Sequence, residues 1–330
     1  MKKTCYLGID VGSVSTNFVL IDENEEVFYE LYLRTGGKPI NALSAGMKKI
    51  WDEFGGSIQV NGVGTTGSGR QLASVIIGAD VVKNEITTHA IAAQKEVPGV
   101  RTILEIGGQD SKIIILRNGV ICDFAMNTVC AAGTGSFLDR QAARLEIPIE
   151  EFGAYALRST TPVRIAGRCA VFAESDMIHK QQTGHSMEDI ICGLCHALVR
   201  NYLNNLAKNK ELEEPIVFQG GVAANVGIVA AFEEILQKKI KIPRHFNVMG
   251  AYGSAIMARK QIHKTGTKTA FYGFESALED YRAKSIECND CSNMCEIIEI
   301  HCGSGPVACW GDRCGKWSGR FVESGIRKSV

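Results

Sequence analysis

Runs of apolar residues near the start of the chain predict three consecutive strands. Residues 5–20 first alternate between apolar and polar and then become continuously apolar, and a Gly-Ser turn at residues 12–13 divides them into two strands. Residues 26–33 give a third strand after a short turn. An amphipathic helix over residues 41–54 and a short buried strand over residues 60–64 come next. This part of the chain therefore predicts a sheet with a helix packed on it.

The same order of elements recurs in the middle of the chain. A strand over residues 101–106 ends at a Gly-Gly turn, a second strand spans residues 112–116, and the Asn118-Gly119 hairpin leads into a third over residues 119–125. The pattern then predicts a strand over residues 216–219 and helices over residues 136–145, 187–208, 225–237 and 250–262. The repeat indicates an α/β protein with two lobes of like topology.

The predicted elements divide the chain into three parts. Lobe I is expected over residues 1–97, completed by the helix near residues 250–262, and lobe II over residues 98–249. A small cysteine-rich module is expected over residues 265–330. The length of 330 residues suits this division, because single hydrophobic cores rarely exceed ~250–300 residues.

Composition and charge argue against several classes of function. Lys and Arg together number 36, as do Asp and Glu, so no net positive charge favours nucleic acid as a partner. No apolar run approaches the ~18 residues that a membrane helix needs. The N-terminus runs straight into a strand, without the apolar stretch and cleavage site of a signal peptide. We expect a cytoplasmic protein that binds neither a membrane nor nucleic acid.

Three glycine-marked turns, each at the end of a predicted strand, are suited to binding a nucleotide. In the first, Gly12 lets backbone N–H groups approach a polyphosphate, and Asp10 is placed to hold Mg²⁺ through its waters. The second repeats this cradle and adds acidic and amide groups that would orient a water molecule or the metal. The third would pack against a purine. The expected catalytic residues are Asp10, Glu105, Gln109 and Asp110, and the expected nucleotide-binding residues are Gly12, Ser13, Ser15, Thr16, Gly107, Gly108, Gly220, Gly221 and Asn225.

The chain has 12 cysteines, which in a cytosolic protein favours metal or redox chemistry over disulfides. Cys130 and Cys169 each lie in a glycine-marked segment of lobe II. A [4Fe–4S] cluster normally takes four thiolates, and a symmetric dimer would supply four from two cysteines per chain. The alternative is a pair of buried free thiols. Four others lie in apolar or helix-periodic surroundings and are expected to be core thiols, namely Cys5, Cys122, Cys192 and Cys195.

The remaining six cysteines crowd near the C-terminus and predict a small metal module. A Cys-x₂-Cys-x₃-Cys knuckle is followed by strands over residues 296–302 and 307–310, with a turn over residues 303–306, and then by a returning cysteine. Zinc is the first expectation, an auxiliary iron–sulfur cluster the second and no metal the third, since an all-thiolate site suits both metals. The expected ligands are Cys288, Cys291, Cys295 and Cys314, with Cys309 and Cys302 as substitutes.

The residues of these sites resemble a known family. The segment Gly-Ile-Asp-Val-Gly-Ser-Val-Ser-Thr from Gly8 resembles the first phosphate motif of the acetate kinase/sugar kinase/Hsp70/actin superfamily, residues 105–112 resemble the second, and Gly220-Gly221 falls in its adenosine motif. The segments around the two lobe II cysteines are similar to those of the BadF/BadG/BcrA/BcrD family, the ATPase activators of 2-hydroxyacyl-CoA dehydratases and of benzoyl-CoA reductases. Reductases that feed double-cubane iron–sulfur proteins fit equally well. The resemblance covers residues 4–262. None of the turns has a P-loop sequence. None has the Gly-x-Gly-x-x-Gly sequence either, and this second absence argues against a nicotinamide enzyme.

The resemblance implies an actin-like ATPase with two ribonuclease H-like lobes of mixed sheet and flanking helices, which binds ATP and Mg²⁺. It also implies a homodimer bridged by one [4Fe–4S] cluster on Cys130 and Cys169, with ferredoxin or flavodoxin as electron donor and an iron–sulfur dehydratase or reductase as acceptor. ATP binding and hydrolysis would move the helix after Cys130 and drive a low-potential electron into the acceptor. The alternatives are a small-molecule kinase of the same fold and an actin-like scaffold without enzymatic activity.

Overall fold

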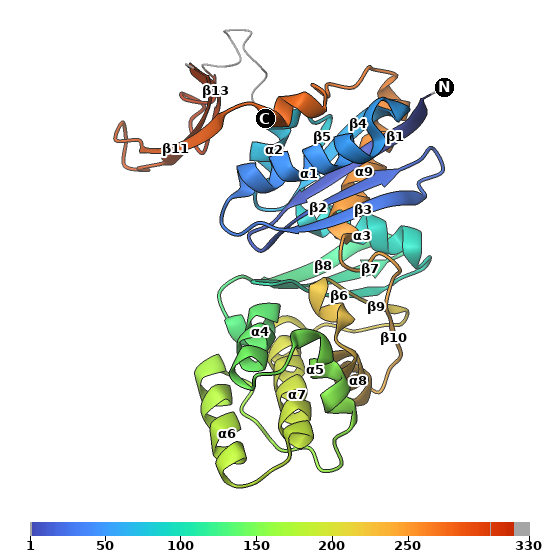
Figure 1. The fold of residues 1–330 in the computed structure, drawn as a ribbon, viewed down its shortest axis with the longest axis vertical. Coiled ribbons are helices and arrows are strands. Elements are labelled where there is room, and N and C mark those ends of the chain that lie inside the picture. The colour runs from blue at the N-terminus through green and yellow to red at the C-terminus, as the bar shows by residue number, and fades with distance from the viewer. Residues whose placement is uncertain (1, 304, 320–330) are drawn as a thin grey trace. The chain divides into compact units, whose positions relative to one another are not determined.

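The structure, a computed structural model, describes residues 2–303 and 305–319, and these fall into two compact units (Figure 1). Unit 1 contains the described residues up to Thr88 and from Gly250 onward, and unit 2 spans His89–Met249. Each unit is built on a five-stranded mixed sheet, and a third sheet of three strands lies near the C-terminus. Among the helices of the described residues, none has the length and apolar character needed to cross a membrane.

The sheet of unit 1 has the strand order β3-β2-β1-β4-β5. β1 runs antiparallel to β2 and parallel to β4. Side chains alternate along β1, so that Leu7 and Ile9 enter a core with helices α1 and α2 while Gly8 faces α9 on the other side of the sheet. The bounds are β1 (Lys3–Val11), β2 (Ser15–Ile21), β3 (Val27–Arg34), α1 (Pro39–Phe54), β4 (Ile58–Thr66), α2 (Arg70–Ile77), β5 (Val81–Val82), α3 (Glu85–Glu96) and α9 (Met249–Thr265).

Glycines in the strands let α9 pack directly on the sheet of unit 1. A Cβ atom on Gly8 would overlap the carbonyl oxygen of Ala251, and one on Gly64 would overlap that of Ser254. Glycine is therefore required at both positions, because any larger residue would push the helix away from the strands. The last long helix of the chain is in this way a component of the N-terminal sheet.

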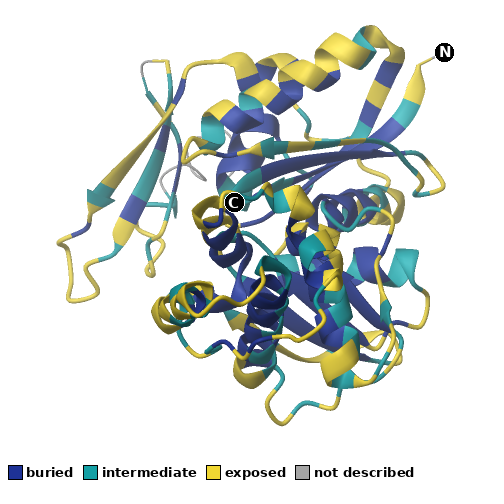
Figure 2. Ribbon diagram, turned by 60° about the horizontal axis from the view of Figure 1, so that its bottom comes forward, coloured by how far each residue is buried: buried dark blue, intermediate teal, exposed yellow. Residues whose placement is uncertain are grey.

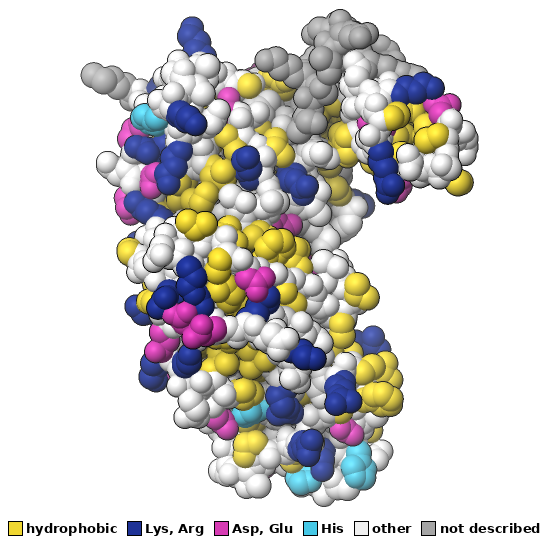
Figure 3. Space-filling model, turned by 180° about the vertical axis from the view of Figure 1, so that it is seen from behind, with side chains coloured by type: hydrophobic (Ala, Val, Ile, Leu, Met, Phe, Trp, Pro, Cys, Tyr) yellow, Lys and Arg dark blue, Asp and Glu magenta, His cyan; other side chains and the backbone are white. Residues whose placement is uncertain are grey.

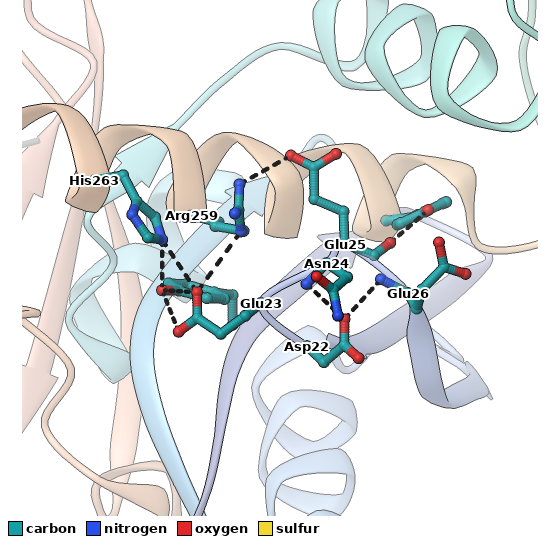
Figure 4. Close-up of polar contacts among 9 residues, drawn as sticks. Asp22, Glu23, Asn24, Glu25, Glu26, Arg259 and His263 are labelled. Atoms are coloured by element: carbon teal, nitrogen blue, oxygen red, sulfur yellow. Dashed lines mark hydrogen bonds and ion pairs between the residues drawn. The ribbon is translucent and has the colours of Figure 1, made fainter.

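Polar contacts hold the other end of α9 against the turn between β2 and β3 (Figure 4). Arg259 Nη1 lies 3.2 Å from Glu25 Oε1, and His263 Nε2 lies 3.1 Å from Glu23 Oε2. The hydroxyl of Tyr6 donates to Glu23 Oε1 over 3.0 Å. The contacts of Arg259 and His263 join residues more than 200 positions apart in the chain and hold this end of α9 in place.

The sheet of unit 2 repeats the plan of unit 1, with the order β10-β9-β6-β7-β8. β6 takes the place of β1, since it is antiparallel to β7 and parallel to β9. This confirms the prediction of two lobes of like topology. The bounds are β6 (Thr102–Ile106), β7 (Ser111–Arg117), β8 (Val120–Asn127), α4 (Gly135–Arg144), α5 (Ile149–Leu157), α6 (Ala170–Gln182), α7 (Met187–Leu206), β9 (Ile216–Gln219), α8 (Val226–Leu236) and β10 (Ile240–Lys241).

The C-terminal module adds a small antiparallel sheet to unit 1. Its strands are β11 (Tyr281–Glu287), β12 (Glu296–Cys302) and β13 (Gly305–Trp310), in the order β11-β12-β13. Figure 2 shows the inner strands of the two large sheets mostly in dark blue, whereas the strands of the module are mostly teal and yellow, as expected of a sheet with little core. The predicted turn over residues 303–306 includes Ser304, and the predicted module extends over residues 320–330; these residues lie outside the part that the structure describes.

The structure contains elements that the sequence pattern did not predict. Helices α2, α3, α5 and α6 were missed, as was β11. In α6 the apolar side chains of Val171 and Phe172 are exposed, so the helix lacks the one-sided apolar face on which such a prediction depends. The prediction that Cys122 is a core thiol is wrong, because it lies exposed on the edge strand β8. Cys5 and Cys195 are buried as expected, and burial raises the pKa of Cys5 to about 12.

Candidate functional site

The turn between β1 and β2 presents the first predicted phosphate loop. The backbone N–H of Gly12 donates to the carbonyl oxygen of Ser15 over 2.8 Å, and Thr35 Oγ1 donates to the carbonyl oxygen of Gly12 over 2.8 Å. Ser13 is exposed and Ser15 half-buried, so both hydroxyls are accessible to a ligand. Thr16 is fully buried with its hydroxyl 3.0 Å from Thr35 Oγ1, which assigns its side chain to bracing the loop.

Asp10 lies one residue before the end of β1, next to a second glycine turn. Gly67 has a φ of +89°, and a Cβ atom there would lie 2.5 Å from Asp10 Oδ1. The N–H of Gly69 donates to the carbonyl oxygen of Val11 over 2.8 Å. Two backbone turns therefore flank the half-buried Asp10 carboxylate.

Unit 2 has a buried ion-pair network at the second predicted phosphate loop. Lys112 Nζ lies 3.1 Å from Glu105 Oε2 and 2.8 Å from Asp110 Oδ2. The side chains of Lys112 and Glu105 are only 2% and 5% exposed, whereas that of Asp110 is 32% exposed. One lysine thus fixes two of the predicted catalytic carboxylates, and Gln109 between them is exposed. We did not predict a role for Lys112 from the sequence, because lysine is almost always a surface residue.

The third glycine turn lies directly beside this network. β6 and β9 are parallel neighbours in which Glu105 pairs with Gln219, so both strands end at the same edge. Gly220 has a φ of +87°, and a Cβ atom there would lie 2.8 Å from Glu105 Oε1. Gln219 Nε2 also lies 2.7 Å from Nδ1 of the buried His89, and burial lowers the pKa of His89 to about 3, so the imidazole is neutral.

The two ends of the Asn225 side-chain amide have different surroundings. Its Oδ1 caps α8 by accepting from the N–H groups of Gly227 and Ile228 over 3.0 and 3.1 Å. Its Nδ2 is buried without a hydrogen-bond partner among the described residues. Gly221 beside it has open space where a side chain would be. A free amide donor next to an open glycine fits a bound nucleotide, since buried donors are otherwise satisfied.

Hydrogen bonds connect the second phosphate loop to the helix that follows Cys130. The N–H groups of Gly135 and Ser136, at the start of α4, donate to the carbonyl oxygens of Gly107 and Gly108 over 2.9 and 2.8 Å. The hydroxyl of Ser136 donates to the carbonyl oxygen of Gly108 as well. The first turn of α4 is therefore bonded directly to the predicted phosphate cradle.

The two cysteine segments meet at one side chain of α7. Asn201 Nδ2 donates to the carbonyl oxygen of Gly167, two residues before Cys169, over 2.5 Å. A Cβ atom on Gly133, three residues after Cys130, would lie 2.8 Å from Asn201 Oδ1. Both cysteines are half-buried, and each sits at the N-terminal cap of a helical segment. Cys130 caps a single 3₁₀ turn, whereas Cys169 caps the α-helix α6, whose unpaired N–H groups and dipole favour negative charge at that thiol.

The surface around the cysteines is unusually apolar. Val129 is 94% exposed, and Val171 and Phe172 are 68% and 65% exposed. Each lies within three residues of Cys130 or Cys169. Behind them, Glu174 of α6 forms an ion pair with Arg144 of α4, so the two helices that carry the cysteine segments are tied together. Exposed apolar groups of this size mark a surface that another molecule covers.

Only some of the C-terminal cysteines lie close together in the structure. Cys288 and Cys309 are buried in a small cluster against which Cys295 packs, and the indole Nε1 of Trp317 lies 3.4 Å from Cys288 Sγ. Cys291 and Cys314 are exposed, and Cys302 Sγ donates to Glu279. Within residues 2–303 and 305–319, no three His, Cys, Asp or Glu side chains lie close enough to hold a metal ion. The ligand set Cys288, Cys291, Cys295 and Cys314 stays a prediction.

Comparisons with known proteins show the family to which the chain is related. Residues 7–258 match the family model described as the BadF/BadG/BcrA/BcrD ATPase family. The (R)-2-hydroxyglutaryl-CoA dehydratase activating ATPase of Acidaminococcus fermentans is 35% identical over 266 residues, which are 78% of this chain and 98% of that protein. The 2-hydroxyisocaproyl-CoA dehydratase activator of Clostridioides difficile is 34% identical over 254 residues, 76% of this chain and 94% of that protein.

A solved structure of such an activator has the same fold. The activator of the 2-hydroxyisocaproyl-CoA dehydratase from Clostridium difficile with bound ADPNP superposes with a TM-score of 0.74 at 31% sequence identity. The match covers 79% of this chain and 97% of that chain. Units 1 and 2 thus form an actin-like ATPase fold, and the C-terminal module lies beyond the residues that the family model matches.

Proposed function

The chain belongs to the BadF/BadG/BcrA/BcrD ATPase family and is an ATPase, and from this premise we propose that it is an ATP-dependent activator of an iron–sulfur enzyme. In this proposal two copies share one [4Fe–4S] cluster through Cys130 and Cys169 of each subunit. Ferredoxin or flavodoxin supplies the electrons. The acceptor is a 2-hydroxyacyl-CoA dehydratase-like enzyme or a double-cubane protein.

The observation that carries the proposal is the convergence of the two cysteine segments on Asn201. Each subunit offers two thiols on one surface, so a twofold axis through that surface would complete a set of four. The exposed Val129, Val171 and Phe172 surround the thiols, and a second copy would cover them. When bound, such a cluster supplies a one-electron carrier whose potential depends on its hydrogen bonds and exposure.

The glycine turns would bind the nucleotide. The turns at Gly12, Ser13 and Ser15 of unit 1, and at Gly107 and Gly108 of unit 2, would let phosphates approach the backbone closely, and Ser13 and Ser15 would add hydroxyl donors. Asp10 would hold Mg²⁺ through water, and Gly220, Gly221 and Asn225 would line the adenosine. Glu105, Gln109 and Asp110 would orient the attacking water, with Lys112 keeping the two carboxylates in place.

Coupling between the nucleotide and the cysteines follows from the start of α4. Because Gly135 and Ser136 are bonded to Gly107 and Gly108, a shift of the phosphate loop moves the segment that begins at Cys130. The ion pair between Arg144 and Glu174 then carries the shift to α6, whose N-terminal cap is Cys169. Both thiols of a subunit would respond to the same nucleotide.

The test is anaerobic purification with analysis of iron, sulfide and oligomeric state. We expect about four iron atoms per dimer in the wild type. Cys130→Ser and Cys169→Ser should each lose this iron and weaken the dimer, whereas Cys122→Ser, which changes an exposed cysteine of the same unit, should keep both. Full iron content in either of the first two variants would refute the proposal.

A further inference from the structure

Unit 2 contains a groove next to the Cys169 segment that the proposed function does not use. The groove has a volume of about 750 Å³ and runs between the segment before Cys169 and the C-terminal half of α7. We call it the basic groove; its polar lining consists of Arg168, Asn201, Asn204, Asn205, Lys208 and Lys210. Asn201 also contacts both cysteine segments, so the groove adjoins the surface where the thiols lie.

The charge of the groove is positive. Arg168 and Lys208 carry charges without an acidic side chain in the described lining, and Lys210 is paired with Asp123 of β8. Arg200 lies one helical turn before Asn204 on α7, and its guanidinium donates to the carbonyl oxygen of Ile165 over 2.9 Å. The face of the molecule in Figure 3 mixes positive, acidic and apolar side chains. The described lining of the basic groove contains basic but no acidic side chains, and this favours an acidic partner.

The exposure of the lining indicates a protein partner. Arg168, Asn204, Asn205 and Lys208 are all exposed. The rest of the described lining includes the apolar residues Leu203, Ala207, Leu212 and Leu236. An apolar floor edged by long, solvated polar side chains suits a transient protein interface, which has a polar rim. A transient interface is also what an electron carrier needs, because it must leave after each transfer.

We propose that the basic groove is the docking surface for the acidic electron-carrier protein that reduces the shared cluster. The proposal rests on the proposed function, since it assumes a cluster at Cys130 and Cys169. Arg168 is adjacent to Cys169 in the chain, so a carrier seated in the groove has its own redox centre close to the cluster ligand. In a symmetric dimer each subunit would offer one such groove beside the same centre.

The experiment measures how fast a strongly acidic reduced ferredoxin reduces the anaerobic dimer in a stopped-flow instrument. In Lys208→Glu the second-order rate should fall about tenfold at low salt, since a positive rim charge mainly affects the association rate. The difference should shrink as salt rises, because the screening length falls from about 10 Å at 0.1 M to about 3 Å at 1 M. Lys49→Glu, which makes the same change on the exposed face of α1, is the matched control and should keep the wild-type rate.

Two results would overturn the proposal. One is an equal ferredoxin rate for Lys208→Glu and Lys49→Glu. The other is a Lys208→Glu variant that ferredoxin reduces at the wild-type rate but that, with dithionite as donor, passes electrons to the acceptor enzyme more slowly than the wild type. The groove would then bind the acceptor and not the donor. Failure of the proposed function is separately visible, because a wild-type dimer without a cluster shows no bleaching by dithionite before any carrier is added.

Discussion

At the scale of single residues, the centre of unit 2 depends on a buried charge network. Lys112 Nζ lies 3.1 Å from Glu105 Oε2 and 2.8 Å from Asp110 Oδ2. Tyr202 Oη donates to the carbonyl oxygen of Lys112 over 2.6 Å and so anchors its backbone from α7. The arrangement keeps a lysine where the interior would otherwise exclude it.

Replacing Lys112 by methionine should be strongly destabilising. Lys112→Met leaves the carboxylate of Glu105 buried without its cation, and we expect the free energy of unfolding at pH 7 to fall by about 3 kcal/mol. Urea denaturation of the apo-protein measures the change. Lys83→Met, at an exposed lysine, should be nearly neutral. The double variant Glu105→Gln/Lys112→Met should recover part of the loss, and an unchanged midpoint for the single variant would contradict the network.

His89 should make stability fall in mild acid. Its pKa is lowered to about 3 in the folded protein, chiefly by burial, against 6.5 for a free imidazole. Below pH 6.5 the unfolded chain therefore takes up a proton that the folded chain does not, so the free energy of unfolding decreases as the pH falls. We expect His89→Asn to lessen this slope by up to about 1.4 kcal/mol per pH unit. Urea titrations between pH 7 and 5 measure the free energy of unfolding of both proteins. If it changes with pH by the same slope in the wild type and in His89→Asn, His89 is not the cause.

The residue scale also shows what the sequence could not reveal. The glycines at 12, 107, 108 and 220 were recognisable because a turn after a strand restricts the residue type. Asn201 lies in the middle of an unbroken helical pattern, and nothing in that pattern shows that its amide contacts two distant segments. The paired function of Asn225, as a helix cap with a free amide, likewise depends on packing around it.

At the scale of elements, the strand plan was predictable and several helices were not. β1, β2 and β3 and their counterparts β6, β7 and β8 have clear periodicity and short turns, so their order in two sheets could be expected. α5 and α6 are short and expose Leu157, Val171 and Phe172, which removes the contrast between faces on which helix prediction relies. The missed α6 matters most, since Cys169 caps it.

The contact between the phosphate loop and α4 gives a test of coupling. Ser136→Ala removes the hydroxyl bond to Gly108 and leaves the backbone bonds in place. We expect the iron content to stay unchanged. ATP-dependent electron transfer should become about fivefold slower, because the loss of one hydrogen bond of about 1 kcal/mol corresponds to a rate change of that size. Ser175→Ala, which removes an exposed serine bond on α6, is the control. If the EPR signal changes between ADP and ATP by the same amount in Ser136→Ala as in Ser175→Ala, Ser136 is not the link.

At the scale of the whole chain, polar contacts of one carboxylate and apolar packing both hold the C-terminal module on unit 1. Asp80 accepts from the N–H of Val63 over 2.8 Å and from Thr269 Oγ1 and the N–H of Ala270 over 2.7 Å each. Phe274 packs against Trp51 of α1 with ring centroids 5.9 Å apart. The segment after α9 is therefore an integral part of unit 1.

Removing the Asp80 carboxylate should loosen this segment. Asp80→Ala leaves the hydrogen-bond donors of Thr269 and Ala270 without their acceptor, and we expect a loss of about 1–3 kcal/mol in the free energy of unfolding. Limited proteolysis should also cut between residues 266 and 273 sooner than in the wild type. The matched control is Asp52→Ala, at an exposed ion pair on α1. Equal cleavage rates in the two variants would show that Asp80 does not anchor the module.

The division of the chain has a consequence for its synthesis. All of unit 2 has left the ribosome once the polypeptide has passed residue 249, whereas the sheet of unit 1 must still wait for α9 to fill the space above Gly8 and Gly64. Nascent domains generally fold as they emerge. The later half of the fold should thus mature first, with its thiol loops formed on the growing chain while the earlier half remains open at one face.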